Sequence, residues 1–202
     1  MKKTIGWLAL GIFCATGASA EVSGDFGYAV SNGVAVITNY AGTNAVLEIP
    51  AELDGYAVAE IGYMAFAGNG GLSTVSIPSS VTNIHAQAFG GCSALREMIV
   101  PDTVVGIEMG IVGGSGITNL VIGSGLTETP VGAFGGLSAL RSVKIGTNVT
   151  IIGGSAFGGC SQLSNVELPP RLTELSGSLF GGCGALVSIE IPGSVTNIRS
   201  SA

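Results

Sequence analysis

Residues 156–178 read AFGGCSQLSNVELPPRLTELSGS, and residues 179–202 repeat this pattern as LFGGCGALVSIEIPGSVTNIRSSA. In both stretches a phenylalanine precedes two glycines and a cysteine, and aliphatic residues then recur up to a proline. The phenylalanine position returns along the chain every 23 residues, except for one interval of 45 that a valine divides into 23 and 22. A fixed period of this length indicates a solenoid of stacked repeats. The anchor residues of the six predicted repeats are Phe66, Phe89, Val112, Phe134, Phe157 and Phe180.

Each repeat contains a short alternating segment that predicts a β-strand. In the first repeat two aliphatic residues, Val75 and Ile77, alternate with polar ones, so one face of the segment points inward. A proline follows this segment in four repeats and is expected at the strand end, because it lacks the amide hydrogen that a ladder uses. The spacing L-x-x-V-x-I matches the leucine-rich repeat pattern. The predicted fold is mainly β, a right-handed leucine-rich repeat solenoid of about six 23-residue rungs with a small N-terminal β cap.

Glycine accounts for 34 of the 202 residues, well above its usual share of about 7%. Two glycines follow the anchor residue in five of the six repeats. We interpret them as a tight corner that requires positive φ or close contact between rungs, since no phosphate-binding glycine motif occurs. The third repeat is one residue shorter, with Ile111-Val112 and Thr129 in place of the usual alanine-phenylalanine pair and aliphatic residue. It is predicted to be the weakest rung and the place where the solenoid would bend.

The first twenty residues have the features of a secretory signal peptide. A basic start at Lys2 and Lys3 precedes an apolar stretch, and Ala18-Ser19-Ala20 supplies the small residues of a cleavage site. The apolar stretch is shorter than the ~18–20 residues that span a bilayer, and no later segment is a candidate span. Cleavage between Ala20 and Glu21 is therefore expected. The predicted divisions are a signal peptide over 1–20, an N-terminal cap over 21–46 and the solenoid over 47–202.

The repeat unit resembles that of the BspA-type leucine-rich repeat family. The pattern AF-x-G-C-x-x-L-x-x-V-x-I-P-x-S-V-T-x-I underlies residues 156–175 and 179–198, and the segments 28–38, 47–50 and 55–62 are similar to the usual opening of that family. The resemblance covers about residues 26–202. It implies a secreted or surface-exposed solenoid, with adhesion and binding of host proteins in some members. It implies no substrate.

The charge balance argues against nucleic-acid binding. The chain carries a net charge of -6, and removal of the signal peptide leaves five basic against thirteen acidic residues, a net of -8. Residues 21–95 contain no lysine or arginine. A chain of this kind offers no basic surface to phosphates. The expected partner is a protein or glycoprotein rather than a nucleic acid, and no membrane span is expected after cleavage.

Catalytic chemistry is not expected either. His85, the one histidine of the chain, occupies a repeat position that Glu108 holds in the next repeat, and we interpret it as facing a turn and exposed. No zinc-ligand spacing and no G-x-S-x-G motif occurs. Glu48, Glu52 and Asp54 are close in sequence and were considered as calcium ligands, but they lack the calcium-loop pattern, and Asp54-Gly55 is typical of a turn. We predict no enzyme activity, no cofactor and no metal.

The cysteines beyond the signal peptide are Cys92, Cys160 and Cys183, which occupy one repeat position. Adjacent rungs bring equivalent residues to about 4.8 Å, a separation that permits a disulfide. A bridge between Cys160 and Cys183 is therefore one alternative. The other, which we favour, is three buried thiols that pack as small hydrophobic groups. Cys92 is separated from the others by two intervening rungs.

The stacked strands offer the surface most suited to binding, because equivalent positions form an extended ladder. Ile99 and Val121 make an outward apolar pair flanked by basic residues, and such a patch can mark a protein contact. We predict a secreted or cell-surface protein that binds a protein or glycoprotein as an adhesin does. The alternative is a structural envelope component or a self-associating fragment of a longer repeat protein, because no polar cap follows the last rung. The candidate binding residues are Arg96, Ile99, Val121, Arg141, Lys144, Glu167 and Glu190.

Overall fold

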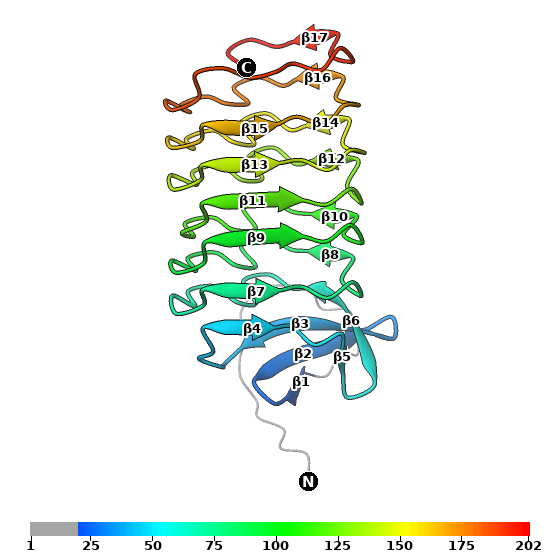
Figure 1. Cartoon of the computed structure of the whole chain (residues 1–202). Helices are drawn as coiled ribbons and strands as arrows, with labels where there is room; N and C mark the ends of the chain where they lie inside the picture. The colour runs from blue at the N-terminus through cyan, green and yellow to red at the C-terminus, as the bar shows by residue number, and fades with distance from the viewer. Residues whose placement is uncertain (1–19) are drawn as a thin grey trace.

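The computed structural model describes residues 20–202. The predicted signal peptide lies almost entirely outside these residues. The described part contains seventeen strands and no helix and forms a solenoid of about seven turns with a spacing of about 23 residues. Figure 1 shows the turns stacked from the N-terminal strands to β17 (Asn197–Ile198). The predicted leucine-rich repeat solenoid is thus confirmed, with one turn preceding the six predicted repeats.

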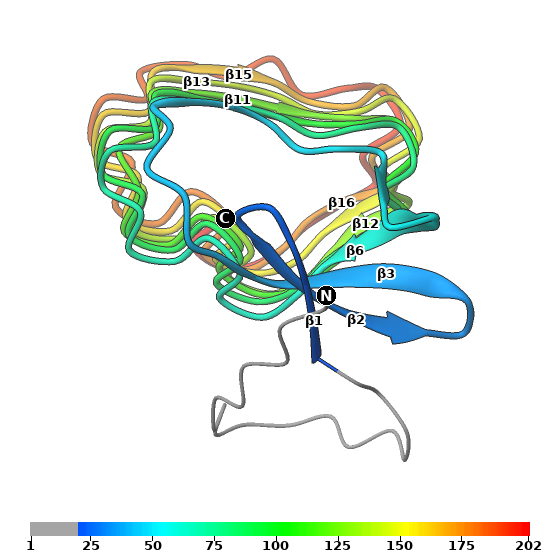
Figure 2. The same ribbon diagram turned by 90° about the horizontal axis from the view of Figure 1, so that it is seen from below.

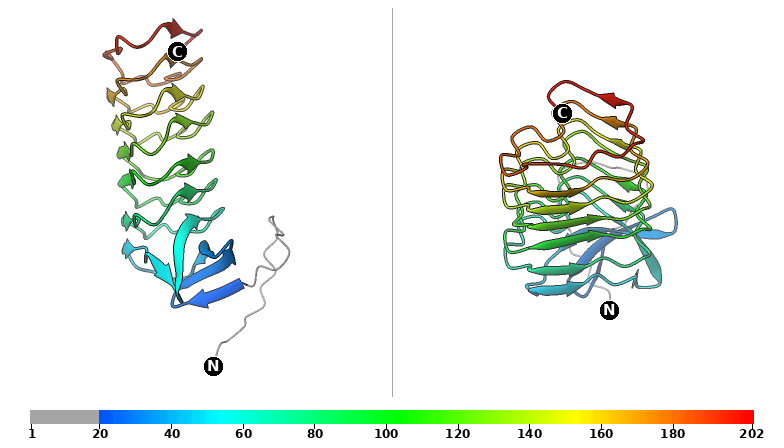
Figure 3. Two further views of the ribbon diagram at one scale, coloured as in Figure 1. Left: turned by 90° about the vertical axis from the view of Figure 1, so that its right-hand side faces the viewer. Right: turned by 45° about the horizontal axis from the view of Figure 1, so that its top comes forward.

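The N-terminal end is an antiparallel meander joined to the first turn. Strands β1 (Ala20–Ser23), β2 (Phe26–Ser31) and β3 (Val34–Tyr40) pair antiparallel in sequence order. Strand β3 then pairs in parallel with β6 (Tyr56–Ile61), which also forms a hairpin with β5 (Glu52–Leu53). Figures 2 and 3 show β2 and β3 at one end of the stack, where they extend beyond the outline of the rungs. The meander covers the sheet edge that the first turn would otherwise expose.

One side of the solenoid, which we call the front ladder, carries one short strand in most rungs. Strand β4 (Val46–Glu48) pairs with β7 (Thr74–Ser76). A separate sheet contains β9 (Glu97–Val100), β11 (Asn119–Ile122), β13 (Ser142–Lys144) and β15 (Asn165–Glu167), all parallel. As expected, the prolines follow the strands. No strand forms over residues 188–190 in the last rung.

Prolines stack above one another at three steps of the front ladder, of which one is paired, with Pro50 beneath Pro78 beside β4 and β7, and two are unpaired. Strands β7 and β9 do not pair, and Pro78 and Pro101 occupy equivalent positions after them. Beyond β15 the last rung is also unpaired, and there Pro169 and Pro192 occupy equivalent positions. Each of the three paired steps between β9 and β15 has a glycine, Gly123 or Gly146, in at least one of the two rungs. The Gly123 amide donates to the Val100 carbonyl at 2.9 Å, a hydrogen bond that a proline cannot make.

The second side, which we call the back ladder, consists of two-residue strands after β6. Strands β6, β8 (Asn83–Ile84) and β10 (Gly106–Ile107) pair in parallel. Strands β12 (Glu128–Thr129), β14 (Ile151–Ile152), β16 (Glu174–Leu175) and β17 form a second parallel group. No pairing joins β10 to β12, and Figure 1 shows a wider step there. The interruption falls in the third repeat, where the sequence predicted the weakest rung.

The anchor residues form an aromatic column inside the solenoid. Phe66 stacks on Phe89 with ring centroids 5.0 Å apart, and Phe157 lies 5.6 Å from Phe134 and 5.9 Å from Phe180. Val112 separates the two groups of rings and is itself fully buried, as is its neighbour Ile111. Replacement of alanine-phenylalanine by isoleucine-valine therefore keeps the third rung filled, because the larger first residue compensates for the smaller second one.

The glycine corner is confirmed at its second position. The second glycine of each pair has positive φ, for example +70° at Gly91 and +77° at Gly159, and Gly68 takes this role in the first repeat. A second column of positive φ was not foreseen, because most of its members are not glycine. It contains Met64, Gln87, Gly110, Gly132, Ser155, Ser178 and Ser201.

The three cysteines are free and buried. Each thiol donates to the carbonyl of the anchor phenylalanine one rung below: Cys92 to Phe66 at 3.2 Å, Cys160 to Phe134 at 3.4 Å and Cys183 to Phe157 at 3.2 Å. Burial raises the pKa of the Cys92 and Cys160 thiols to about 11, so they are weak nucleophiles. The disulfide alternative is not realised in the structure.

Candidate functional site

The strand register brings four of the predicted binding residues into one outward column. In β9, β11, β13 and β15 this column consists of Ile99, Val121, Lys144 and Glu167, each directly paired with the next. Ile99 is 53% exposed, and Val121 is half-buried. We call these four residues the front column. Its lower half is apolar and its upper half is charged.

The charged half of the front column is an ion pair that the sequence analysis did not identify. The Lys144 Nζ atom lies 3.1 Å from Oε2 of Glu167, and both side chains are largely exposed. An exposed pair of this kind contributes little to stability. Each charge is partly neutralised by the other, so Lys144 is less available to a partner than the sequence suggested.

The two arginines occupy a neighbouring column at the start of the strands, separated by Thr118. The Arg96 guanidinium donates to the Ser93 carbonyl at 2.8 Å and to the Gly116 carbonyl at 3.1 Å, so it is held against the backbone. The Arg141 side chain is exposed, and it forms no ion pair with any residue in the part of the chain that the structure describes. Of the predicted basic residues, Arg141 is therefore the one best placed to meet a partner.

Glu190 is not joined to the front column by strand pairing, and its place in the binding surface stays a prediction. It is exposed and lies in the last rung, where residues 188–190 form no strand and pair with nothing in β15. Pro169 and Pro192 stack here and offer no amide hydrogen at the strand end, but Pro50 and Pro78 stack in the same way beside the paired β4 and β7, so the prolines alone do not account for the missing pairing. The front column ends at Glu167.

His85 lies between two carboxylates on the back ladder rather than in an exposed turn. Its Nε2 atom is 2.7 Å from Oε2 of Glu60 and its Nδ1 atom is 3.1 Å from Oε1 of Glu108, and only 33% of its side chain is exposed. Burial lowers the pKa of His85, but the hydrogen bonds to Glu60 and Glu108 outweigh this, and the net shift is upward from 6.5. The pKa of Glu108 is lowered, first by the hydrogen bond that its carboxylate accepts from the Ala86 amide and then by His85. Three successive rungs are thus linked by one charged chain of side chains.

We expect stability to depend on pH through this linkage. Because the pKa of His85 is raised in the folded state, its contribution to stability is complete below about pH 6.5 and is lost as pH rises through the folded pKa. The pKa of Glu108 is lowered in the folded state, so its contribution to stability is complete above about pH 4.5 and is lost as pH falls through the folded pKa. The free energy of unfolding, from urea titration, should therefore be lower at pH 8 than at pH 5.5, by about 0.5 kcal/mol for partly exposed pairs. His85→Gln should remove most of this difference, and an unchanged pH profile in the variant would contradict the assignment.

Asp54, one of the three carboxylates that lie close in the sequence, accepts hydrogen bonds from two hydroxyl groups. Asp54, in a turn with φ of 48°, accepts hydrogen bonds from the Ser23 hydroxyl at 3.0 Å and the Tyr28 hydroxyl at 2.9 Å. Burial and then the hydrogen bond to Asp54 raise the pKa of Tyr28 to about 12. Through these two hydrogen bonds Asp54 links β1 and β2 to the turn between β5 and β6. Within residues 20–202 no group of three or more histidine, cysteine or carboxylate side chains is arranged to hold a metal ion.

The comparisons with known proteins agree with this repeat architecture. The family model described as "BspA type Leucine rich repeat region" matches in six copies, over residues 59–157 and 132–202. The chain belongs to this family. No curated protein matches it.

Solved structures of bacterial leucine-rich repeat proteins share the fold. The T. pallidum leucine-rich repeat protein is 29% identical with a TM-score of 0.80, and the match covers 89% of this chain and 86% of that one. A protein from Bacteroides ovatus is 30% identical with a TM-score of 0.76, covering 89% and 49%. One from Eubacterium ventriosum is 25% identical with a TM-score of 0.75, covering 86% and 48%. This member of the BspA-type family thus spans about half the length of the last two relatives. Among its described residues, no helix is long and apolar enough to cross a membrane.

Proposed function

We propose that this BspA-type protein is exported, is cleaved between Ala20 and Glu21, and binds a protein or glycoprotein at the cell surface or outside the cell. The observation that carries the proposal is the register that places Ile99 beside Val121 on the outside of the front ladder. Aliphatic side chains that point outward from adjacent strands form a small apolar patch, and such patches are typical of contact surfaces. Membership of the family and the N-terminal sequence support the proposed location.

The chemistry of the surface around the front column indicates the kind of partner. Arg141, immediately before β13, has no ion-pair partner among the described residues, whereas Lys144 is already engaged with Glu167. A surface that offers both an arginine and exposed aliphatic side chains has the composition of an interface centre, where a few residues dominate the binding energy. The complementary surface would present an acidic group beside apolar side chains.

We expect substitution of the apolar pair and of Arg141 to weaken binding. The chain from Glu21 would be titrated against immobilised matrix glycoproteins at two salt concentrations, alongside the variants Ile99→Ser with Val121→Ser, Arg141→Gln and Lys144→Gln. Loss of the apolar pair or of Arg141 should weaken binding about tenfold, the effect of ~1.4 kcal/mol, and Lys144→Gln should have a smaller effect. Arg141→Gln should also reduce the salt dependence.

Val187→Ser is the matched control, since Val187 is 94% exposed but lies in the last rung away from the front column. An equal loss with Val187→Ser, or saturable binding that none of the front variants changes, would contradict the proposed surface.

Self-association is a second candidate that one observation favours. In the described structure β17 pairs on one side only, and Ile191 and Ile198 of the same rung are exposed. An exposed strand edge with apolar neighbours is a template for pairing with another chain. Sedimentation over a dilution series would show a concentration-dependent mass for a self-associating protein, and Ile198→Lys should then restore the monomer.

A further inference from the structure

One of the backbone hydrogen bonds missing from the interrupted back ladder is lost at Pro130. In the neighbouring rungs the residue at this position donates its amide hydrogen to the rung below: Glu108 to the Ile84 carbonyl at 3.1 Å and Gly153 to the Thr129 carbonyl at 3.0 Å. Pro130 has no amide hydrogen and cannot donate to Ile107. Among residues 20–202 no backbone hydrogen bond joins β10 to β12. Among the described residues the Ile107 carbonyl therefore accepts no backbone hydrogen bond from the rung above.

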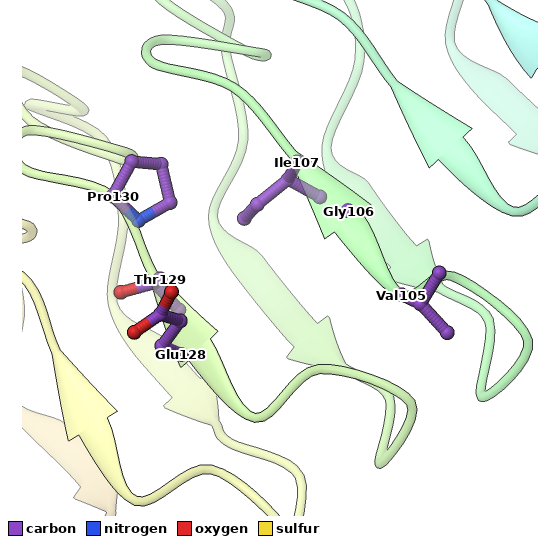
Figure 4. A pocket seen from close by; sticks show the side chains of 6 residues that line it. All are labelled: Val105, Gly106, Ile107, Glu128, Thr129 and Pro130. Atoms are coloured by element: carbon purple, nitrogen blue, oxygen red, sulfur yellow. The ribbon is translucent and has the colours of Figure 1, made fainter.

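The missing hydrogen bond coincides with a hollow in the surface. Gly106 pairs with Asn83 and occupies an outward position, where it contributes no side chain. A groove of about 200 Å³ lies between β10 and β12, and a second of about 190 Å³ lies between β8 and β10; both are lined by Gly106 and Ile107. Figure 4 shows the first groove, with Val105 and Ile107 on one side and Glu128, Thr129 and Pro130 on the other. We call the two together the Gly106 hollow.

The Gly106 hollow combines apolar walls with hydrogen-bond acceptors. Its walls are aliphatic at Val105, Ile107 and Pro130, and the carboxylates of Glu108 and Glu128 stand on its two sides. Within the described residues Glu128 has no ion-pair partner. Glu108 is already engaged with His85, so the aliphatic wall beside the Glu128 carboxylate is the part that is complementary to a long aliphatic side chain with a cationic end.

The surroundings of the Gly106 hollow favour a protein as the source of that cation. Two exposed aliphatic side chains, Met109 at 62% and Val131 at 65%, directly follow the lining residues Glu108 and Pro130 in the chain. No lysine or arginine occurs between residues 21 and 95, so the lower rungs of the back ladder present only acidic groups and His85. The volume is below the ~300–1,000 Å³ of sites that enclose a whole small molecule. It suits one side chain, with neighbouring apolar residues resting on the rim.

We propose that the Gly106 hollow binds a lysine or arginine side chain presented by an extended apolar segment of a partner protein. The aliphatic stem lies along Val105, Ile107 and Pro130, and the cationic end meets Glu128 and the free carbonyl of Ile107. This surface belongs to the back ladder and is separate from the front column, so it stands whether or not the front column binds a partner.

The test uses short capped peptides as probes for the chain from Glu21. One peptide has a central arginine between leucines, and the others carry lysine, citrulline or glutamate in its place. Amide chemical shifts of the ¹⁵N-labelled protein locate the contact and give its affinity. The arginine and lysine peptides should shift the amides of Ile107 and Thr129. The citrulline peptide, which keeps the shape without the charge, should bind about fivefold more weakly.

Two variants connect the signal to the Gly106 hollow. Gly106→Leu fills it; a Cβ there meets the flexible end of the Asn83 side chain, so the fold should be retained while the shifts are lost. Glu128→Gln should weaken the arginine peptide about fivefold and leave the citrulline peptide unchanged. Glu97→Gln on β9 is the control and should have no effect.

Each other outcome overturns the proposal. Shifts confined to β9–β15, equal binding of arginine and citrulline peptides, or no shifts with any peptide would exclude a cation site at Gly106. If Gly106→Leu fails to fold, the Glu128→Gln comparison and the citrulline peptide still decide the question.

Discussion

Replacement of Phe157 by alanine is expected to lower the free energy of unfolding by about 3–5 kcal/mol, the range for deleting a buried aromatic side chain. Phe157 is fully buried and stands in the middle of the upper aromatic group, with ring centroids 5.6 Å and 5.9 Å from those of Phe134 and Phe180. Its removal leaves a cavity with aromatic faces on both sides. Because each rung is stabilised by its neighbours, the loss weakens two interfaces at once. Urea unfolding followed by far-UV circular dichroism measures the effect.

Val112→Ala is the comparison that tests whether the third rung is the weakest. Val112 is as deeply buried as Phe157, but its truncation removes fewer atoms and should lower the free energy of unfolding by about 1.6 kcal/mol, at ~0.8 kcal/mol per carbon. It lies in the column between the two groups of stacked rings, and the back ladder of its rung is already unpaired on one side. Equal losses at Val112 and Phe157 would contradict the prediction that the third rung contributes least.

The repeat period was sufficient to predict the fold. Once the anchors were aligned, the inward positions, the strand ends at the prolines and the glycine corner followed, because the same local sequence meets the same neighbours in every rung. The positive φ at Gly91 and its equivalents could be foreseen since only glycine adopts it without strain. The column that contains Gln87 and Ser155 could not, because these residues carry no sequence signal for that conformation.

The candidate sites were predicted only in part, since they depend on departures from the repeat. Alignment placed Ile99, Val121, Lys144 and Glu167 in one column, as the structure has them. It also placed Glu190 there, but residues 188–190 form no strand and pair with nothing in β15. The pattern assigned His85 to a turn, whereas the carboxylates that enclose it come from the rungs below and above.

The Gly106 hollow shows why such departures matter for function. In a fully regular back ladder the backbone amide and carbonyl groups of adjacent rungs would pair at every step, and no gap would separate two strands. One shortened repeat, one proline without an amide hydrogen and one glycine without a side chain together produce a local surface that differs from every other rung. In a repeat protein the irregular rung is therefore the natural place to look for specific recognition.

Gly146→Ala is expected to destabilise the solenoid by about 1–3 kcal/mol, the range for overpacking a filled interior. Gly146 occupies the strand-end position above Gly123, and an added Cβ would meet the backbone carbonyl of Gly123 and lie 2.8 Å from the Cα atom of Ser124. These are backbone atoms and cannot rotate away, so β11 and β13 must separate. The hydrogen bonds between Asn119–Val121 and Ser142–Lys144 should weaken, which amide exchange would show directly.

Gly71→Ala is the matched control for this prediction. Nothing lies within 4 Å of a Cβ at Gly71, and Ala94, Ala139 and Ala185 occupy the equivalent position in other repeats. This substitution should be neutral or stabilise by about 0.4–1 kcal/mol, because alanine restricts the unfolded chain. If both variants unfold at the same urea concentration, the close approach of rungs at Gly146 does not limit stability. If only Gly146→Ala lowers the free energy of unfolding, the pairing of β11 with β13 requires a residue without a side chain at position 146. The alignment of Val121 with Lys144 would then depend on this glycine as well.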